Sequence, residues 1–290
     1  MFLVTQLIGL FVVSSYIDGI NLPYGMQPPD EVNQDTSVVS IIIAFIIAIS
    51  LFILLTKMKA VAFIRLWFFV VTTIALGLSL NVILLKLTLT SYVAIMAIII
   101  ALPLAYLKIF KRNLIVHNFT ELLIYPGIAA VFIPLLNVMG ITILLLIISL
   151  YDIWAVWQSE FMQKMAKYQI ENLKFFTGFF VPYADKKQKQ KIKLLKDKYG
   201  EDEKVLESQF KKAKIKINLA ILGGGDVIFP IITAGVFYKT FGIIPALIIT
   251  ASATLALLFL FILARKGKFY PAMPFITIGM YLGMIVSWLI

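Results

Sequence analysis

The sequence predicts an all-α protein that crosses a membrane nine times, with its N-terminus inside and its C-terminus outside. Of its 290 residues, 61% are hydrophobic and 14% are charged, whereas soluble domains carry roughly 25% charged residues. Its mean hydropathy is +0.97, and apolar runs of about 17 to 25 residues, the length that crosses a bilayer, recur along the chain. The basic residues are also distributed as the loops of a membrane protein require.

Nine apolar segments are expected to cross the membrane. They are residues 2–17, 38–56, 66–85, 89–107, 122–136, 138–157, 217–238, 241–263 and 272–290. The first lacks the basic flank of a signal peptide, so we expect it to be retained as a span. The segments leave no room for a soluble domain, and we expect one domain over 1–290. Spans one to six would occupy 1–165, a basic cytoplasmic loop 166–216, and spans seven to nine 217–290.

The orientation follows from the basic residues. Of 26 lysines and arginines, only Lys86 and Lys239 fall in loops on one side of the predicted membrane, and most of the others lie between Lys164 and Lys216. Because basic loops stay on the cytoplasmic side, this split predicts an inside N-terminus and an outside C-terminus. The net charge of +11 therefore reflects topology, and no nucleic-acid partner is expected.

Two aspartates lie inside apolar segments, Asp152 in the sixth and Asp226 in the seventh. An acid at bilayer depth is costly, so it is a functional-site hypothesis by default. Asp152 precedes Glu160 by eight residues and Asp226 follows Lys216 by ten, which places them roughly 12 and 15 Å from the same membrane face. The two consecutive antiparallel helices should therefore bring both acids to nearly the same depth.

We expect the two aspartates to form a pair. No lysine or arginine lies deep in a predicted span, so neither acid should find a salt-bridge partner in the membrane. Two close carboxyls cannot both ionise cheaply, and they share a proton. Such a pair can activate water for peptide hydrolysis. The alternative is that each acid separately caps a kink or pairs with a base.

Glycines and prolines accompany this predicted pair. Gly223, Gly224 and Gly225 directly precede Asp226 and cost a helix roughly 3 kcal/mol relative to alanine. They could serve close helix packing, or local unwinding with a close approach of backbone to a ligand. The segment Pro271-Ala272-Met273-Pro274 permits only a broken or first-turn helix, and locally it favours a helix start.

Together these residues resemble the presenilin and signal-peptide-peptidase family of intramembrane aspartyl proteases. Tyr151-Asp152 resembles the family's YD motif on the sixth span, and Gly223 to Asp226 resembles its GxGD motif on the seventh. Pro271-Ala272-Met273 stands where the family has Pro-Ala-Leu, with methionine in place of leucine. The orientation resembles presenilin and is opposite to that of signal peptide peptidase. The short loops resemble the compact archaeal presenilin homologues.

The resemblance implies an intramembrane endopeptidase that cuts transmembrane helices of substrate proteins. Asp152 and Asp226 would be catalytic, one as the general base on water and the other as the acid, with the assignment left open. The residues implied to position the motifs or the substrate are Tyr151, Gly223, Gly225, Pro271, Ala272 and Met273. No metal or organic cofactor is expected, and the partners would be substrate helices and the lipid bilayer.

Two other functions fit paired membrane acids. A prepilin-type GxGD peptidase would place its acids nearer the cytoplasmic surface, and it lacks a proline motif at a ninth span. An ion or proton pathway also uses such acids, but transporter folds often contain internal repeats, and none is apparent here.

Four further polar or aromatic residues carry expectations of their own. His117 is expected at the membrane interface, and Asn81 is expected to hydrogen-bond a neighbouring helix. Trp154 and Trp157 are expected to act as packing and interface anchors.

Overall fold

The computed structural model describes residues 1–26, 34–58, 60–87, 92–111, 113–158, 165, 168–173, 175–183, 194, 218–264 and 270–289. The chain forms two compact units, which are considered separately. The first comprises Met1–Thr177 with Gly223–Ile290, and the second comprises Gly178–Leu222. Nearly all of the lysine-rich stretch from Lys186 to Lys216, predicted as a basic loop, lies outside the described residues.

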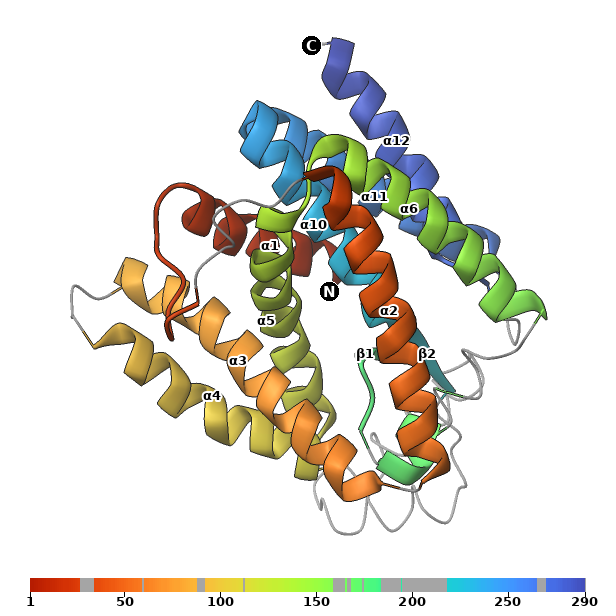
Figure 1. Cartoon of the computed structure of the whole chain (residues 1–290). Coiled ribbons are helices and arrows are strands. Elements are labelled where there is room, and N and C mark those ends of the chain that lie inside the picture. Colours follow the sequence, from red (N-terminus) through yellow and green to blue (C-terminus); the bar gives the residue numbers. More distant parts are fainter. Residues whose placement is uncertain are drawn as a thin grey trace. The chain divides into compact units, whose positions relative to one another are not determined.

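The described part of the first unit contains an α-helix for each predicted span (Figure 1). They are α1 (Phe2–Ile17), α2 (Gln34–Lys57), α3 (Val61–Leu87), α4 (Val93–Phe110), α5 (Leu114–Phe132), α6 (Val138–Ile153), α10 (Gly224–Phe241), α11 (Ile243–Leu263) and α12 (Met273–Leu289). Short helical turns follow two of them, η1 (Ile133–Leu135) after α5 and the π-helical η2 (Trp154–Gln158) after α6. A further π-helical turn, η3, covers Gln169–Leu173. The predicted all-α class therefore holds for the membrane part.

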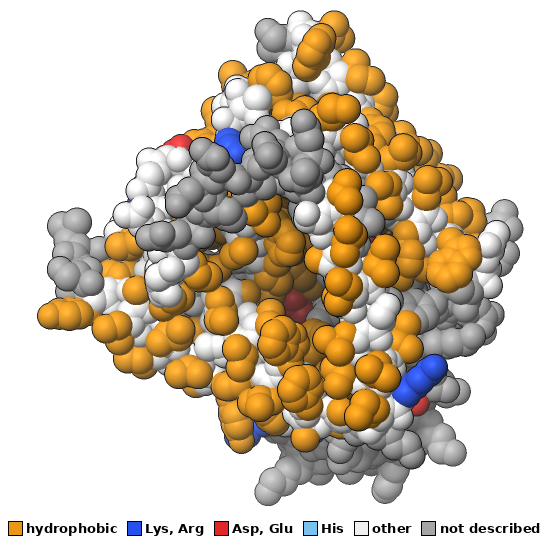
Figure 2. Space-filling view, in the orientation of Figure 1, with side chains coloured by type: hydrophobic (Ala, Val, Ile, Leu, Met, Phe, Trp, Pro, Cys, Tyr) orange, Lys and Arg blue, Asp and Glu red, His pale blue; other side chains and the backbone are white. Residues whose placement is uncertain are grey.

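Five stretches of helix are long and apolar enough to cross a membrane. They are Val61–Leu87, Val93–Phe110, Leu114–Leu135, Val138–Gln158 and Ile243–Leu263. Shorter apolar helices cover Phe2–Ile17, Ile46–Lys57 and Met273–Leu289. Hydrophobic side chains cover most of the described surface in Figure 2. These features are those of a multi-pass membrane protein.

Helix α5 packs against α1, α3, α4 and α10. Its contact with α3 is a backbone-to-backbone approach, because a Cβ added to Gly127 would overlap the carbonyl oxygen of Ala75. Buried alanines such as Ala101 and Ala105 let α4 approach the same core closely. Small residues at helix contacts are the usual device for close packing in membranes.

Helix α10 packs against α1, α5, α6, α11 and α12. Helices α11 and α12 also meet closely, since a Cβ on Gly279 would overlap the side chain of Ala256. Helix α6 lies against both α10 and α12. The two predicted acidic helices are therefore direct neighbours, and α12 contacts both.

The prediction for Asn81 is confirmed. Its Nδ2 donates to the hydroxyl of Tyr16 at 3.4 Å, and that hydroxyl donates to the carbonyl oxygen of Leu78 at 2.7 Å. These bonds connect α1 with α3. The polar side chain is buried and therefore needs such a partner.

The predicted fifth span begins too late in the chain. Helix α5 starts at Leu114 because Oδ1 of Asn113 accepts from the backbone N–H groups of Ile115 at 2.9 Å and Val116 at 3.3 Å. The polar first turns of α5 contain His117, which was expected at the interface but is buried. Hydropathy missed this part because polar residues there pair with one another inside the protein.

The predicted seventh span also differs, because its first residues form a strand. In the second unit, β1 (Gly178–Tyr183) pairs with β2 (Asn218–Gly223) in a two-stranded sheet. Helix α10 starts only at Gly224. Glycine is a poor helix former, so the backbone before it satisfies its hydrogen bonds by strand pairing instead. An apolar run alone cannot distinguish these two solutions.

Replacing Gly127 with alanine should lower the free energy of unfolding by about 1–3 kcal/mol, because overpacking forces α3 and α5 apart. Thermal unfolding in detergent measures this loss. Val131→Ala is the matched control, because Val131 lies on the same helix and is exposed. Equal stability of Gly127→Ala and wild type would contradict the close α3–α5 contact.

Candidate functional site

Asp152 lies one residue before the end of α6, where the chain continues as the π-helical turn η2. π-Helical segments are rare and occur frequently at functional sites. Asp152 is 7% exposed, whereas the preceding Tyr151 is 36% exposed. The helix therefore turns the aspartate inward and the tyrosine outward, as expected for neighbours about 100° apart.

The start of α12 holds the carboxylate of Asp152. Oδ2 of Asp152 accepts a hydrogen bond from the backbone N–H of Met273 at 3.1 Å, and the N–H of Ala272 also donates to this carboxylate. First-turn N–H groups have no partner within their own helix. The segment Pro271-Ala272-Met273 is therefore both a helix start, as the prolines predicted, and the holder of an acid.

A second bond fixes α6 against α12 close to this point. The hydroxyl of Ser149 donates to the hydroxyl of Thr277 at 2.7 Å, and both side chains are buried. Each residue lies about one helical turn from the Asp152–Met273 contact. The bond limits sliding of one helix along the other and so maintains the hold on the carboxylate.

Asp226 occupies the third position of α10, whose N-cap is Gly223. Its carboxylate accepts a hydrogen bond from the backbone N–H of Gly223, in the manner of the acid in a capping box. A Cβ on Gly223 would lie 3.1 Å from Oδ2 of Asp226. A larger residue at the cap would press against the carboxylate, so the glycine allows this orientation.

The structure brings the two predicted acids together. Helices α6 and α10 pack against each other, and Asp152 and Asp226 interact electrostatically. The ion pairs found in the described residues involve neither aspartate. The local charge is therefore set by two carboxyls and by the backbone N–H groups that donate to them.

The three glycines before Asp226 have three different surroundings. Gly223 makes room for the carboxylate of Asp226, and a Cβ on Gly224 would lie 3.0 Å from both Cε1 and the hydroxyl oxygen of Tyr125. Gly225 is exposed, and a Cβ there would have Phe229 as its nearest neighbour, at 3.9 Å. Close packing therefore applies at Gly224, whereas Gly225 lies within α10 and is exposed, so the approach of a ligand to its backbone stays a prediction.

Gln6 is a site neighbour that the sequence analysis missed. Its side chain on α1 is buried, and Nε2 donates to the carbonyl oxygen of Val227 at 2.9 Å. Val227 directly follows Asp226, so Gln6 supports the first turn of α10. A lone glutamine in the apolar segment 2–17 was the available signal.

Tyr151 and the tryptophans face outward. The ring of Tyr151 lies 6.2 Å from that of Trp154, and Trp154 and Trp157 are exposed, as anchors in lipid would be.

Among the described residues no group of three or more histidine, cysteine or acidic side chains could hold a metal ion. Two carboxyls that lie close together can in general share a proton and activate water.

Comparison with known proteins gives matches over the whole chain. Residues 1–290 match the sequence profile described as signal-peptide peptidase, presenilin aspartyl protease. Among solved structures, a presenilin family intramembrane aspartate protease in space group C222 is similar, with 19% identity and a TM-score of 0.63, over 100% of this chain and 96% of that one. A structure of a presenilin family intramembrane aspartate protease in space group P2 is also similar. It has 18% identity and a TM-score of 0.62, over 99% of this chain and 96% of that one. At such identities the structures show a common fold. No curated protein matches significantly.

Replacing Ser149 with alanine should lower the free energy of unfolding by about 1 kcal/mol or more, because it leaves the buried hydroxyl of Thr277 without this partner. The double variant Ser149→Ala/Thr277→Val should be more stable than Ser149→Ala, because it no longer contains an unpaired buried hydroxyl at position 277. Thermal unfolding of wild type, Ser149→Ala, Thr277→Val and the double variant gives the coupling energy between the two hydroxyls. Strictly additive losses would show that the two hydroxyls do not interact.

Proposed function

This chain belongs to the signal-peptide peptidase and presenilin family of aspartyl proteases, and on that premise we propose that it hydrolyses peptide bonds within transmembrane helices of other proteins. The observation that supports the proposal is the packing of α6 against α10, which places Asp152 and Asp226 within electrostatic range of each other. Both come from apolar helices, and each is held by backbone N–H groups.

The two aspartates would divide the reaction between them. One carboxylate accepts a proton from water, whose oxygen then attacks the scissile carbonyl carbon. The other carboxyl, protonated, donates a hydrogen bond to the carbonyl oxygen and then transfers that proton to the departing amine, so that the pair ends with one proton, on the first carboxyl. The N–H groups of Met273 and Gly223 orient the carboxylates, which reduces the cost of reaching reactive geometry.

The substrate helix must unwind before it can be cut, because its peptide groups are bonded to one another. The exposed backbone at Gly225 and the non-helical residues before α12 would receive the unwound segment. A substrate segment added there as a strand would find partners for its freed backbone groups. Edge addition satisfies freed backbone groups in other peptide complexes.

The remaining motif residues would act by position. We assign Gly223 to the orientation of Asp226, and Pro271, Ala272 and Met273 to the orientation of Asp152. Gly225 would give the substrate access to backbone. Tyr151, which faces outward, would contact the substrate or lipid beside Asp152.

The orientation in the membrane is part of the proposal. The charge distribution supports a cytoplasmic N-terminus, a cytoplasmic lysine-rich segment over 166–216 and an outer C-terminus. Nine crossings in a single protease domain over 1–290 would then place both aspartates within reach of the cytoplasmic face.

Asp152→Asn and Asp226→Asn should each reduce cleavage of a single-span substrate below detection, because the dyad needs both carboxyls. The purified protein is incubated with the substrate, and fragments are identified by mass spectrometry. Both variants should keep a near-wild-type unfolding temperature, since a neutral amide costs less to bury than a charge. Continued cleavage by either variant would refute the proposed mechanism.

Pro271→Ala should lower the cleavage rate more than it lowers stability. Alanine allows α12 to extend toward its N-terminus, which would move the N–H groups that orient Asp152. Initial rates and thermal unfolding are compared with those of wild type. A wild-type rate would mean that the motif only starts the helix and has no part in catalysis.

A further inference from the structure

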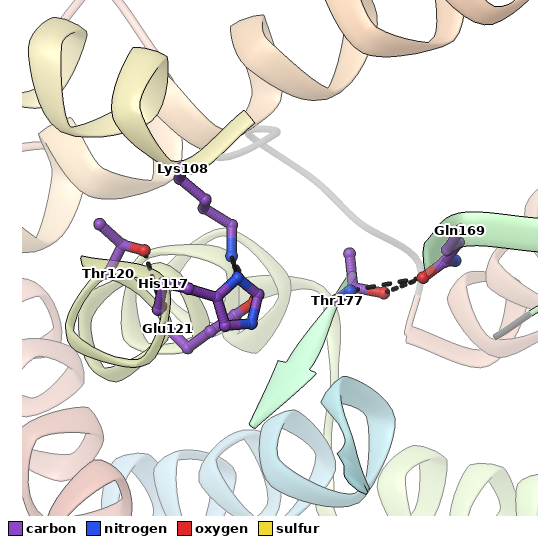
Figure 3. A network of polar contacts seen from close by, with 6 residues as sticks. All are labelled: Lys108, His117, Thr120, Glu121, Gln169 and Thr177. Carbon is purple, nitrogen blue, oxygen red and sulfur yellow. Dashed lines mark hydrogen bonds and ion pairs between the residues drawn. The ribbon is translucent and has the colours of Figure 1, made fainter. Parts of the chain in front are cut away.

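A buried charged cluster lies outside the acid pair, at the contact between α4 and α5 (Figure 3). Nζ of Lys108 forms a hydrogen-bonded ion pair with Oε1 of Glu121 and lies 3.4 Å from Nδ1 of His117. Nε2 of His117 lies 3.7 Å from the same Oε1. Lys108 is 5% exposed and Glu121 is 1% exposed.

Burial of this cluster costs free energy of folding, and the proposed hydrolysis of peptide bonds does not involve it. Burying two charges requires desolvation that their attraction often fails to repay, and an apolar pair of similar volume is frequently as stable. Small residues already pack α4 and α5 closely. A role in helix packing therefore does not by itself account for the charges.

Tyr125 connects the cluster with the acid pair. It follows Glu121 by four residues on α5, so the two side chains lie on one face of the helix. The buried hydroxyl of Tyr125 interacts with the carboxylate of Glu121. The same hydroxyl also interacts electrostatically with Asp226.

The side chain of Tyr125 packs against Gly224. A Cβ there would lie 3.0 Å from two atoms of the Tyr125 ring and hydroxyl, which is tighter than an ordinary contact. The phenol thus occupies space that a side chain at position 224 would fill. Because Gly224 begins α10 and Asp226 is two residues later, the phenol supports the turn that carries the aspartate.

We propose that Tyr125 is a positioning residue for Asp226, held in place by Glu121, whose charge Lys108 balances. This inference rests on the proposed protease function. The phenol fixes the first turn of α10 and with it the direction of the Asp226 carboxyl. A displacement of about 1 Å can cost roughly a hundredfold in rate. Lys108 is needed because an unbalanced Glu121 would repel the negative charge of the dyad.

Tyr125→Phe removes only the hydroxyl and should lower kcat roughly tenfold to a hundredfold, with KM within about twofold of wild type, because the effect is on geometry at the reacting centre. Ser79→Ala is the matched control. It deletes another buried hydroxyl, one that donates to the carbonyl oxygen of Leu123 on α5. The control should lose similar stability and keep its kcat.

The neutral pair Lys108→Met/Glu121→Leu tests the cluster without leaving a lone buried charge. It should fold at least as well as wild type and show a lowered kcat. Adding Tyr125→Phe to this pair should cause no further loss, because Glu121 acts through Tyr125. Wild-type kcat for the neutral pair, or a full second loss in the triple variant, would overturn the proposal.

Asp152→Asn and Asp226→Asn are run in the same assay, which separates the two levels of the proposal. Cleavage by either would refute the protease mechanism itself. If both are inactive while Tyr125→Phe keeps the kcat of wild type, only the positioning role fails. If Tyr125→Phe does not fold, the neutral pair decides in the same way, by its kcat and KM.

Discussion

The structure depends on two carboxyls in an apolar helical bundle, Asp152 buried and Asp226 half-buried, and in the described part of the chain neither forms an ion pair with a basic side chain. Water would hydrate such groups readily, whereas the membrane does not. The carboxylate of Asp152 instead accepts hydrogen bonds from backbone N–H groups at the start of α12. The carboxylate of Asp226 accepts one from the backbone N–H of Gly223, the N-cap of α10. A helix start is suited to this use because its first N–H groups have no other partner.

This need accounts for much of the surrounding sequence. Pro271 and Ala272 keep the chain non-helical until Met273 can donate to Asp152. The glycines before Asp226 leave room in the first turn of α10 for the carboxylate of Asp226 and the ring of Tyr125, and they leave backbone exposed at Gly225. Similar reasoning explains the buried Lys108–Glu121 pair, whose position beside Tyr125 extends the support of the dyad to α4 and α5.

The sequence was sufficient to predict the helices, because apolar length is a large energetic signal, and the two helices that carry the acids are in contact. It placed α1 at residues 2–17, as observed. It failed where local alternatives have similar energies, as at β2, where an apolar run forms a strand. It did not reveal the contact between His117 and Lys108, since polar residues that pair only in three dimensions look like a membrane boundary.

The chain contains no cysteine, which permits a direct measurement of the central contact. In Asp152→Cys/Asp226→Cys, a short bifunctional thiol reagent should link the two positions within one chain. Trypsin cleavage between Lys186 and Lys216 should then leave the halves joined, whereas in either single-cysteine variant they separate. Halves that separate in the treated double variant, with both thiols shown to have reacted, would contradict the pairing of the two aspartates.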